Sequence, residues 1–529
     1  MERRRAACLV PHTREEPLAR SSNKEDAVAT AVEHYTSYKA RPFKREERDK
    51  VTILFGGLTW KHERLVQGAF HNMSYKAQPI PNIQRADLEA GKELIDVGAC
   101  CPTIFTTGSL VNFLKSEVAA KGREDIVNNY LFLTAGACGP CRFGQYHQSY
   151  EMALDGLGLK DFRLLLLDDN KMDSKEEGGG LDINLPLSLG IVWAILCADV
   201  LTDMEYATRP YEVNPGQTDA VMKESVEILY DVFHKRPLKG KKWGAVAWHF
   251  ATPYFKNALR EVRKKWDEVE VDRLQVKPKV KVTGEFWLQT HEGDGNYNIK
   301  RWLEQEGAET IPPPIAIWLA YLLHTPLWRM EKKRHLDKKI PLKMAMVRGF
   351  EKLYNHNYNG FRKALGGVPN QLPDQEELKE LASPYFHHEL RGGEGHMLVG
   401  KALYVYHHKK AHMVCELSPY SCMPNTMSVG AMANVQGRYP DLLYAPIEVK
   451  GDAEVHALSR CQMILTEAKK RAQSDFEEVL QKTGLSVEDL RRLEARRPEL
   501  RRASTRIPHH GYSGMAANYA MHLAKRGRA

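Results

Sequence analysis

Four short apolar runs along the chain are each neighboured by a stretch with helical spacing. They read VTILFGGLTW from Val51, NYLFLTAGA from Asn129, FRLLLLDDN from Phe162 and AHMVCELSPYSC from Ala411. Short runs that stay apolar at successive positions are typical of strands buried on both faces. Because these strands alternate with helices, the pattern predicts parallel α/β units joined by right-handed crossovers.

Helical spacing dominates between Tyr211 and Val269, where QTDAVMKESVEILYDVFHK and NALREVRKKWDEV place apolar residues three and four positions apart. A further strand, KPKVKVTGEFWL from Lys277, precedes the helical pattern YNIKRWLEQEG, and the prolines 312–314 end this unit. The Trp- and Leu-rich stretch 315–330 is predicted to be a packed helix. Helices are also expected near 27–38 and from position 61 onward.

These patterns divide the chain into six segments. We expect a flexible basic arm at 1–48, a first α/β lobe at 49–210, a helical connection at 211–275, a second α/β segment at 276–345, a third α/β segment at 346–473 and a basic helical tail at 474–529. The predicted fold class is α/β, with two or three Rossmann/flavodoxin-like parallel-sheet lobes and helical connections. Ligands of such sheets bind beyond the carboxyl ends of the strands, so the crevice between the lobes is the expected site.

Composition places the chain among large globular proteins of two to four domains, since 529 residues with 43% hydrophobic and 27% charged residues can build several cores. The nine cysteines are an odd number without secretory spacing, which favours reduced thiols or metal ligands over a disulfide framework. The start, MERRRAACLV, lacks the apolar core of a signal peptide. The apolar run 185–200 is expected to be too short for a membrane span. We therefore predict a cytoplasmic protein that does not cross the membrane.

The net charge of +9 is concentrated in the stretches 3–5, 39–50 and 491–506. We interpret them as solvated tails or helix faces. The chain has no zinc-finger spacing and no cluster of aromatic and basic residues for stacking on bases. A nucleic-acid partner is not expected.

The sharpest local motif is Cys138-Gly139-Pro140-Cys141. A two-residue spacer lets two sulfur atoms reach one metal centre or each other. The same four residue types serve as a redox dithiol in thioredoxins, and the strand before and helix after the motif suit that chemistry. The motif alone therefore leaves a metal site and a dithiol both open.

Two further cysteines stand in similar surroundings. Cys101 lies in GACCP and Cys422 in SPYSCMPN, each at a predicted passage into a helix with prolines beside it. Thiolates that converge from separate α/β units are typical of iron-sulfur ligation. We interpret Cys8 and Cys197 as residues without a metal role. The remaining candidate ligands are Cys100, Cys415 and Cys461.

The segment GACGPCRFGQYHQSYEMAL, with CCP upstream and GEFW and SPYSCMPN downstream, resembles the acyl-CoA dehydratase activase-related family. That family is akin to 2-hydroxyglutaryl-CoA dehydratase and benzoyl-CoA reductase subunits and to double-cubane cluster proteins. The resemblance covers most of 51–471. It implies that a separate ATP-hydrolysing activase of the actin/sugar-kinase type passes a low-potential electron to a [4Fe-4S] or double-cubane cluster, for a reductive reaction on a CoA thioester.

Carried over by position, Cys101, Cys141 and Cys422 resemble cluster ligands, and Cys138 joins them. A double cubane with three thiolates in each half would need six ligands, which Cys100 or Cys461 together with Cys415 would complete. The resemblance does not distinguish a catalytic component from an electron carrier, nor a homo-oligomer from a hetero-oligomer.

Other features of the chain carry weaker signals. The chain contains no GxxxxGK[ST] motif, and the glycines 178–180 and 392–393 are interpreted as loops, so ATP hydrolysis is expected from a partner.

The alternatives from other classes are a CxxC dithiol oxidoreductase and a structural zinc protein. The adjacent pairs His387 with His388 and His407 with His408 are not counted as metal ligands, because neighbouring side chains diverge. Candidates for proton transfer or substrate orientation are Glu285, His396 and Asn425.

Overall fold

The computed structural model describes residues 41–96, 98–136, 141–168, 179–237, 242–390 and 395–527. The helix expected near 27–38, most of the expected arm and the residues Cys8 and Cys138 lie outside this part of the chain. The described cysteines are all free thiols: Cys100, Cys101, Cys141, Cys197, Cys415, Cys422 and Cys461.

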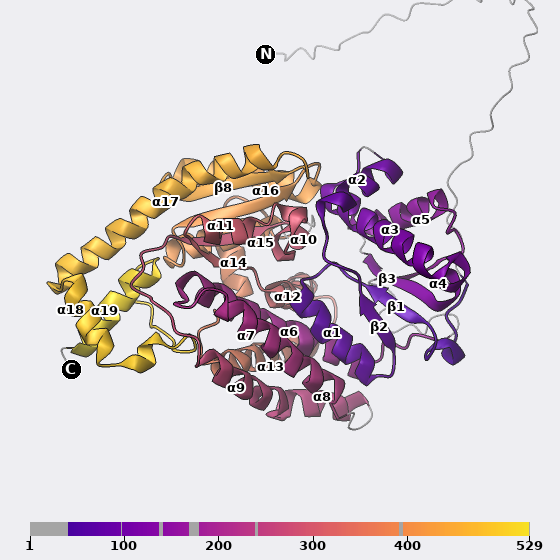
Figure 1. Ribbon diagram of the computed structural model, residues 1–529, viewed down its shortest axis with the longest axis horizontal. Helices are drawn as coiled ribbons and strands as arrows, with labels where there is room; N and C mark the ends of the chain where they lie inside the picture. The colour runs from indigo at the N-terminus through magenta and orange to yellow at the C-terminus, as the bar shows by residue number, and fades with distance from the viewer. Residues whose placement is uncertain are drawn as a thin grey trace, which may run out of the picture. The chain divides into compact units, whose positions relative to one another are not determined.

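The four apolar runs and the Lys277 run all contain strands, as predicted, and the described strands form two parallel sheets (Figure 1). The first sheet has the order β2-β1-β3-β4. Its strands are β1 (Thr52–Phe55), β2 (Lys76–Pro79), β3 (Tyr130–Gly136) and β4 (Arg163–Asp168). The prediction of parallel α/β units is confirmed.

The second sheet has the order β6-β5-β7-β8, which repeats the order of the first. Its strands are β5 (Lys279–Gly284), β6 (Glu309–Ile311), β7 (Met413–Pro419) and β8 (Leu443–Val449). The expected segments 276–345 and 346–473 therefore do not form separate sheets. Strand β7 pairs with β5, with Val282 opposite Cys415, because its apolar residues extend the same buried surface.

Successive residues of the first sheet enter different cores, as the two-residue repeat of a strand requires. Ile53 and Leu131 pack toward one side with residues of α1 and α6, while Leu54 and Phe132 pack toward the other with residues of α3 and α5. Helices thus cover both faces. The helices of this lobe are α1 (Trp60–Asn72), α2 (Arg85–Leu94), α3 (Cys101–Lys121), α4 (Arg123–Asn129) and α5 (Tyr146–Gly156).

The second sheet is covered in the same way. Val282 and Ile447 share a core with residues of α11 and α17, and Val414 shares another with residues of α15 and α16. GEFW was expected in a strand, but β5 ends at Gly284 and a helix begins two residues later. The helices around this sheet are α10 (Phe286–Thr290), α11 (Ile299–Gln305), α14 (Gln375–Ala382), α15 (Gly395–His407), α16 (Met423–Arg438) and α17 (Glu454–Thr483).

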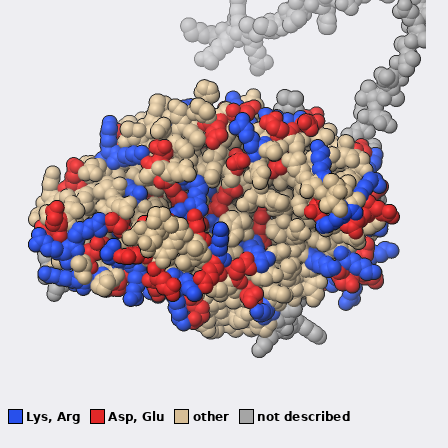
Figure 2. Space-filling model, in the orientation of Figure 1, with Lys and Arg blue, Asp and Glu red and all other residues tan. Residues whose placement is uncertain are grey.

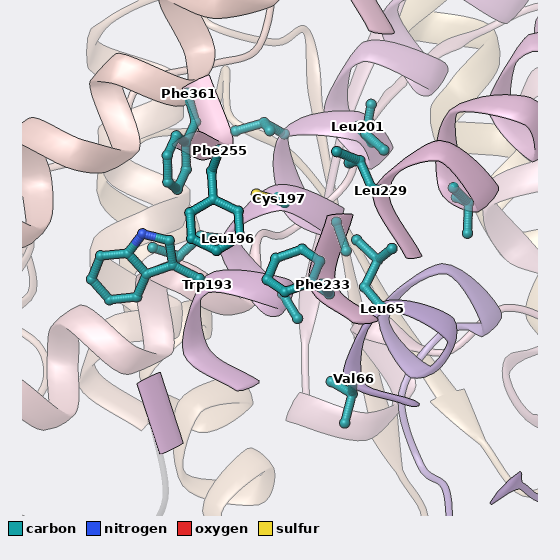
Figure 3. Close-up of a cluster of buried hydrophobic side chains, with 14 of the residues drawn as sticks. Leu65, Val66, Trp193, Leu196, Cys197, Leu201, Leu229, Phe233, Phe255 and Phe361 are labelled. Atoms are coloured by element: carbon teal, nitrogen blue, oxygen red, sulfur yellow. The ribbon is translucent and has the colours of Figure 1, made fainter. Parts of the chain in front are cut away.

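A helical core surrounds α6 (Leu185–Thr208), where Figure 3 shows Trp193, Leu196 and Cys197 among aromatic and aliphatic side chains of neighbouring helices. Cys197 is fully buried in this core. The other helices of this region are α7 (Gln217–His234), α8 (Lys242–Ala251), α9 (Tyr254–Trp266), α12 (Ile315–Lys332) and α13 (Ile340–Ala364).

The run 185–200 was expected to be too short for a membrane span, and this was wrong. Within the described chain, the helix from Leu185, taken to Tyr211, is the one that is long and apolar enough to cross a membrane, and 67% of its apolar stretch is buried inside the protein. It carries the buried acids Asp199, Asp203 and Glu205. A core helix of this kind is weak evidence for a membrane.

The C-terminal segment 474–529 is helical as predicted, but it is packed. The end of α17, together with α18 (Val487–Ala495) and α19 (Met515–Gly527), surrounds a core that contains Leu274 and Phe476. Figure 2 shows basic and acidic side chains interspersed over the visible face.

Candidate functional site

Both sheets have a point at which the chain changes the direction of its crossovers, between β1 and β3 in the first and between β5 and β7 in the second. Ligands of parallel sheets bind beyond the strand ends at such points. Cys141 follows β3, Glu285 follows β5 and Cys422 follows β7. The fold therefore places chemically active residues of both lobes at these points.

Cys100 and Cys422 occupy equivalent positions at the start of two helices. Each is the residue that precedes the first turn, of α3 and α16, and each is followed two residues later by a proline, Pro102 or Pro424. The Cys100 Sγ lies 2.9 Å from the Thr103 Oγ1, and the Cys422 thiol donates to the Asn425 Oδ1 at 3.4 Å. In both helices, a polar side chain three residues later thus holds the sulfur.

The turn before Cys422 has an unusual backbone. Ser421 has a φ of 65°, a left-handed conformation that is costly for a residue other than glycine. On β5, the strand paired with β7, Gly284 has a φ of 131°, and a Cβ there would lie 2.1 Å from the carbonyl oxygen of Leu417. A side chain at position 284 would therefore separate β5 from β7 where Glu285 and Cys422 leave the sheet.

The thiols of Cys100 and Cys141, from the first lobe, lie close enough to Cys422, from the second, to affect its pKa. Cys141 is half-buried and begins the short 3-10 helix Arg142–Gln145. Burial raises the pKa of the Cys422 thiol to about 12, and the charges of Glu285, Cys141 and Cys100 add to this effect. The backbone N–H of Asn425 acts in the opposite direction and lowers that pKa. Thiols of the β3–α5 connection, the start of α3 and the β7–α16 connection therefore share one neighbourhood.

Cys101, the neighbour of Cys100, faces a different environment. It is 3% exposed and packs in an apolar core with Leu88, Phe105 and Val280. Burial, followed by the charge of Cys100, raises the pKa of its thiol far above the usual range. Of this adjacent pair, Cys100 is the one held at the helix start as Cys422 is.

Cys415 and Cys461 lie deeper in the same apolar core. Cys415 is in the middle of β7, Cys461 is on α17, and both are fully buried. A hydrogen bond between the two thiols, with burial, raises the pKa of Cys415. The two thiols therefore contact each other within the core of the second lobe.

A buried polar network supports Cys422 from behind. The Asn425 Nδ2 lies 3.5 Å from the Glu416 Oε1, and Ser428 and Tyr444 donate to the same carboxyl group at 3.2 and 2.9 Å. Burial raises the pKa of Glu416. Asn425, a predicted orienting residue, thus connects the thiol to this carboxyl group.

The other polar candidates, and the histidine pairs, contact neighbouring groups of the protein and so support the fold. The Glu285 Oε2 accepts a hydrogen bond from the backbone N–H of Leu288 at 2.9 Å and so caps α10. His396 is buried against Tyr321 and Trp328, and burial lowers its pKa to about 4. The rings of His387 and His388 stack on each other, and His408 forms an ion pair with Glu377.

No group of three or more His, Cys, Asp and Glu side chains within the described ranges is arranged to hold a metal ion. Each thiolate of a four-iron cube binds a different iron atom, so cube ligands stand further apart than the ligands of a single ion. The described thiols therefore offer no complete single-ion zinc site.

Glu63 is a candidate that sequence reasoning missed. It lies in the first turn of α1, just after β1, and its side chain is buried. The Glu63 Oε1 accepts a hydrogen bond from the backbone N–H of Leu58 at 3.0 Å. Burial raises the pKa of Glu63 to about 8, opposed by the amides of Leu58 and Gly57. The turn after β1 thus carries a carboxyl group that gains and loses its proton near neutral pH.

We expect Glu63→Gln to become more stabilising relative to the native chain as pH rises from about 5 to 8. The folded state keeps the proton on Glu63 up to a higher pH than the unfolded state, so native stability falls across this window by up to about 1.4 kcal/mol per pH unit. Glutamine keeps the acceptor and removes the titration. Urea unfolding at pH 5, 6.5 and 8 measures the difference, and an equal difference at all three values would contradict this assignment.

Buried polar contacts join α1 to the rest of the fold. The Lys61 Nζ lies 2.5 Å from the Glu205 Oε2 and 2.7 Å from the Glu292 Oε1. The next residue, His62, lies between the Thr59 Oγ1 at 2.7 Å and the Asp199 Oδ1 at 3.0 Å. The cavity beside His62 has a volume of about 10 Å³, room for about one water molecule. The polar contacts of Lys61 and His62 therefore hold the fold together rather than bind a substrate.

Comparison of the chain with models of known protein families and with curated proteins finds no match.

Proposed function

We propose that this chain is an iron-sulfur redox protein whose cluster is bound where the two lobes present their thiols. The observation that supports this most is the proximity of Cys100 and Cys141, from the first lobe, to Cys422, from the second, whose pKa they raise. Thiolate sulfur is the ligand that iron-sulfur clusters use. Cys138, which precedes Cys141 by three residues, is the proposed fourth ligand.

The positions of the described thiols fit such a cluster. Cys100 and Cys422 stand at helix starts, where the helix dipole and the first N–H groups favour negative charge on sulfur. Burial raises the pKa of the Cys422 thiol, so cluster binding there would release a proton. When bound, the cluster would supply one-electron transfer at low potential. The hydroxyl of Tyr146, 3.3 Å from the Cys100 Sγ, would donate a hydrogen bond to that thiolate.

The ligand set proposed from the geometry differs from the set carried over by resemblance. Cys100 replaces Cys101 as the ligand from the start of α3, because Cys100 shares the position of Cys422. Cys415 and Cys461 form a hydrogen bond with each other in the core of the second lobe. They stay candidates only for the second half of a double cubane.

The rest of the proposal rests on the resemblance described above. Each sheet has the strand order of a flavodoxin-like lobe without its last strand. We propose that an ATP-hydrolysing activase of the actin/sugar-kinase type donates the electron, that a CoA thioester is the substrate class, and that the protein is cytoplasmic.

The proposed function is tested by reducing anaerobically purified protein with dithionite while recording its visible spectrum. We expect a brown protein with broad absorbance in the blue that decreases on reduction and returns on reoxidation, because bound iron-sulfur clusters carry sulfur-to-iron charge-transfer bands. A colourless protein whose CxxC pair is titrated as a reversible dithiol would support the oxidoreductase instead. A colourless protein with one tightly bound zinc ion would support the structural alternative.

A further inference from the structure

A basic cavity with a volume of about 210 Å³ lies beside the second sheet. The first half of β5, α15, the loop 367–373 and the segment 505–518 contribute to its wall. The wall has one acidic residue, Asp203, against seven basic ones. The basic residues are Arg273, Lys279, Lys281, Arg362, Lys401, Lys410 and Arg506.

Most of this positive charge is not neutralised by the protein. Lys279 forms an ion pair with Glu309 at 2.7 Å. In contrast, the Lys281 Nζ donates to the carbonyl oxygen of Pro312 at 3.0 Å, and the Arg362 Nε donates to that of Pro369 at 2.6 Å. Across the described ranges, five of these cations take part in no ion pair: Arg273, Lys281, Arg362, Lys410 and Arg506.

The acidic groups near the cavity are already engaged. Asp203 accepts hydrogen bonds from the backbone N–H and the side-chain amide of Asn370, and burial raises its pKa. Glu416, whose charge reaches Lys401, accepts hydrogen bonds from Ser428 and Tyr444. Asp203 attracts Lys281 and Arg362 but forms an ion pair with neither within the described ranges, so one buried carboxyl group faces several cations.

The cations also repel one another. Burial and then the charge of Lys401 lower the pKa of Lys281 to about 7, with Asp203 opposing the shift. Burial lowers the pKa of Lys410, and the charges of Lys279, Arg506 and Arg362 lower it further. Like charges gathered at a cavity destabilise the folded chain unless an anion joins them.

We propose that this cavity binds a small, multiply charged phosphate compound, with a diphosphate group as the chemistry that it recognises. Several uncompensated cations call for an anion with two or more charges. Guanidinium groups bind phosphate oxygens in pairs, and lysines add point charges. The volume is below the usual range for drug-sized ligands, which suits a group of diphosphate size. Arg506 is exposed and marks the solvent side of the cavity.

Isothermal titration calorimetry of the full chain with inorganic pyrophosphate, at constant ionic strength, tests this site. We expect saturable binding to one site per chain, tighter than the binding of inorganic phosphate. Arg506→Gln and Lys410→Gln should each weaken pyrophosphate binding about tenfold. Both side chains are at least partly exposed, so these variants should fold, which circular dichroism verifies.

Lys223→Gln is the matched control, because Lys223 is exposed on α7 and the substitution removes the same charge away from the cavity. It should leave pyrophosphate binding unchanged. The proposal would be overturned by folded native protein that shows no saturable binding, by equal affinity for phosphate and pyrophosphate, or by equal binding in all three variants and the native chain. None of these outcomes depends on the presence of an iron-sulfur cluster.

Discussion

Lys61→Met is expected to lower the free energy of unfolding by about 3–5 kcal/mol, the usual cost of removing one partner from a buried ion pair. The Lys61 side chain is 1% exposed, and its Nζ contacts the carboxylates of Glu205 and Glu292. The charge of Lys61, with that of Lys300, holds the pKa of Glu292 down to about 2 despite burial. Methionine would leave the buried carboxylate of Glu292 without this partner and would remove a contact of Glu205.

Urea unfolding at pH 7 measures this effect, with Lys235→Met as the control. Lys235 forms an exposed pair with Asp231, in which the two side chains are 70% and 55% exposed, so its loss should change stability by less than about 1 kcal/mol. The double variant Lys61→Met, Glu292→Gln should recover part of the loss, because it removes one of the stranded charges. A loss below about 1 kcal/mol in Lys61→Met would contradict this account of the contact between α1 and the second lobe.

The strands and their parallel class could be predicted from the sequence because a strand buried on both faces leaves a local signal, a short apolar run. The number of sheets could not. About 100 residues separate β6 from β7 in the chain, and no local pattern tells that β7 returns to pair with β5. The end of β5 at GEFW could not be predicted either. The positive φ of Gly284 ends the strand and a helix follows, but apolar residues alone do not distinguish that helix from a longer strand.

The candidate site could be predicted from the sequence only in part. The prolines near Cys101 and Cys422 correctly indicated helix starts, but the choice between Cys100 and Cys101 depends on which of them stands before the first turn. That difference of one residue turns one thiol toward Thr103 and the other into the core. A proline at the second helical position, as in both α3 and α16, is the signal that could have identified Cys100.

Glu63 and Lys61 were missed because charged residues in an amphipathic pattern normally indicate a solvent-exposed helix face. Their burial results from packing of α1 against α6 and the loop before α11, which are distant in sequence. The basic cavity has the same origin. Its cations come from β5, α13, α15 and the segment after α18, and only the fold gathers them.

Iron content of cysteine variants is the measurement that tests the central claim, that thiols of both lobes hold one cluster. Serine does not replace a thiolate toward a soft metal site, so Cys422→Ser and Cys100→Ser should each lose most of the iron. Cys101→Ala and Cys197→Ala are the controls and should retain it, because these thiols lie in apolar cores.

The iron and acid-labile sulfide of each anaerobically purified variant are measured beside the native chain. The account predicts roughly 4 iron atoms and as many sulfides per native chain for one cubane, or roughly 8 for a double cubane. It predicts severe loss in Cys422→Ser and Cys100→Ser only. Native protein without iron would contradict it. Full iron in Cys422→Ser would also contradict it, because the cluster would then need no ligand from the second lobe.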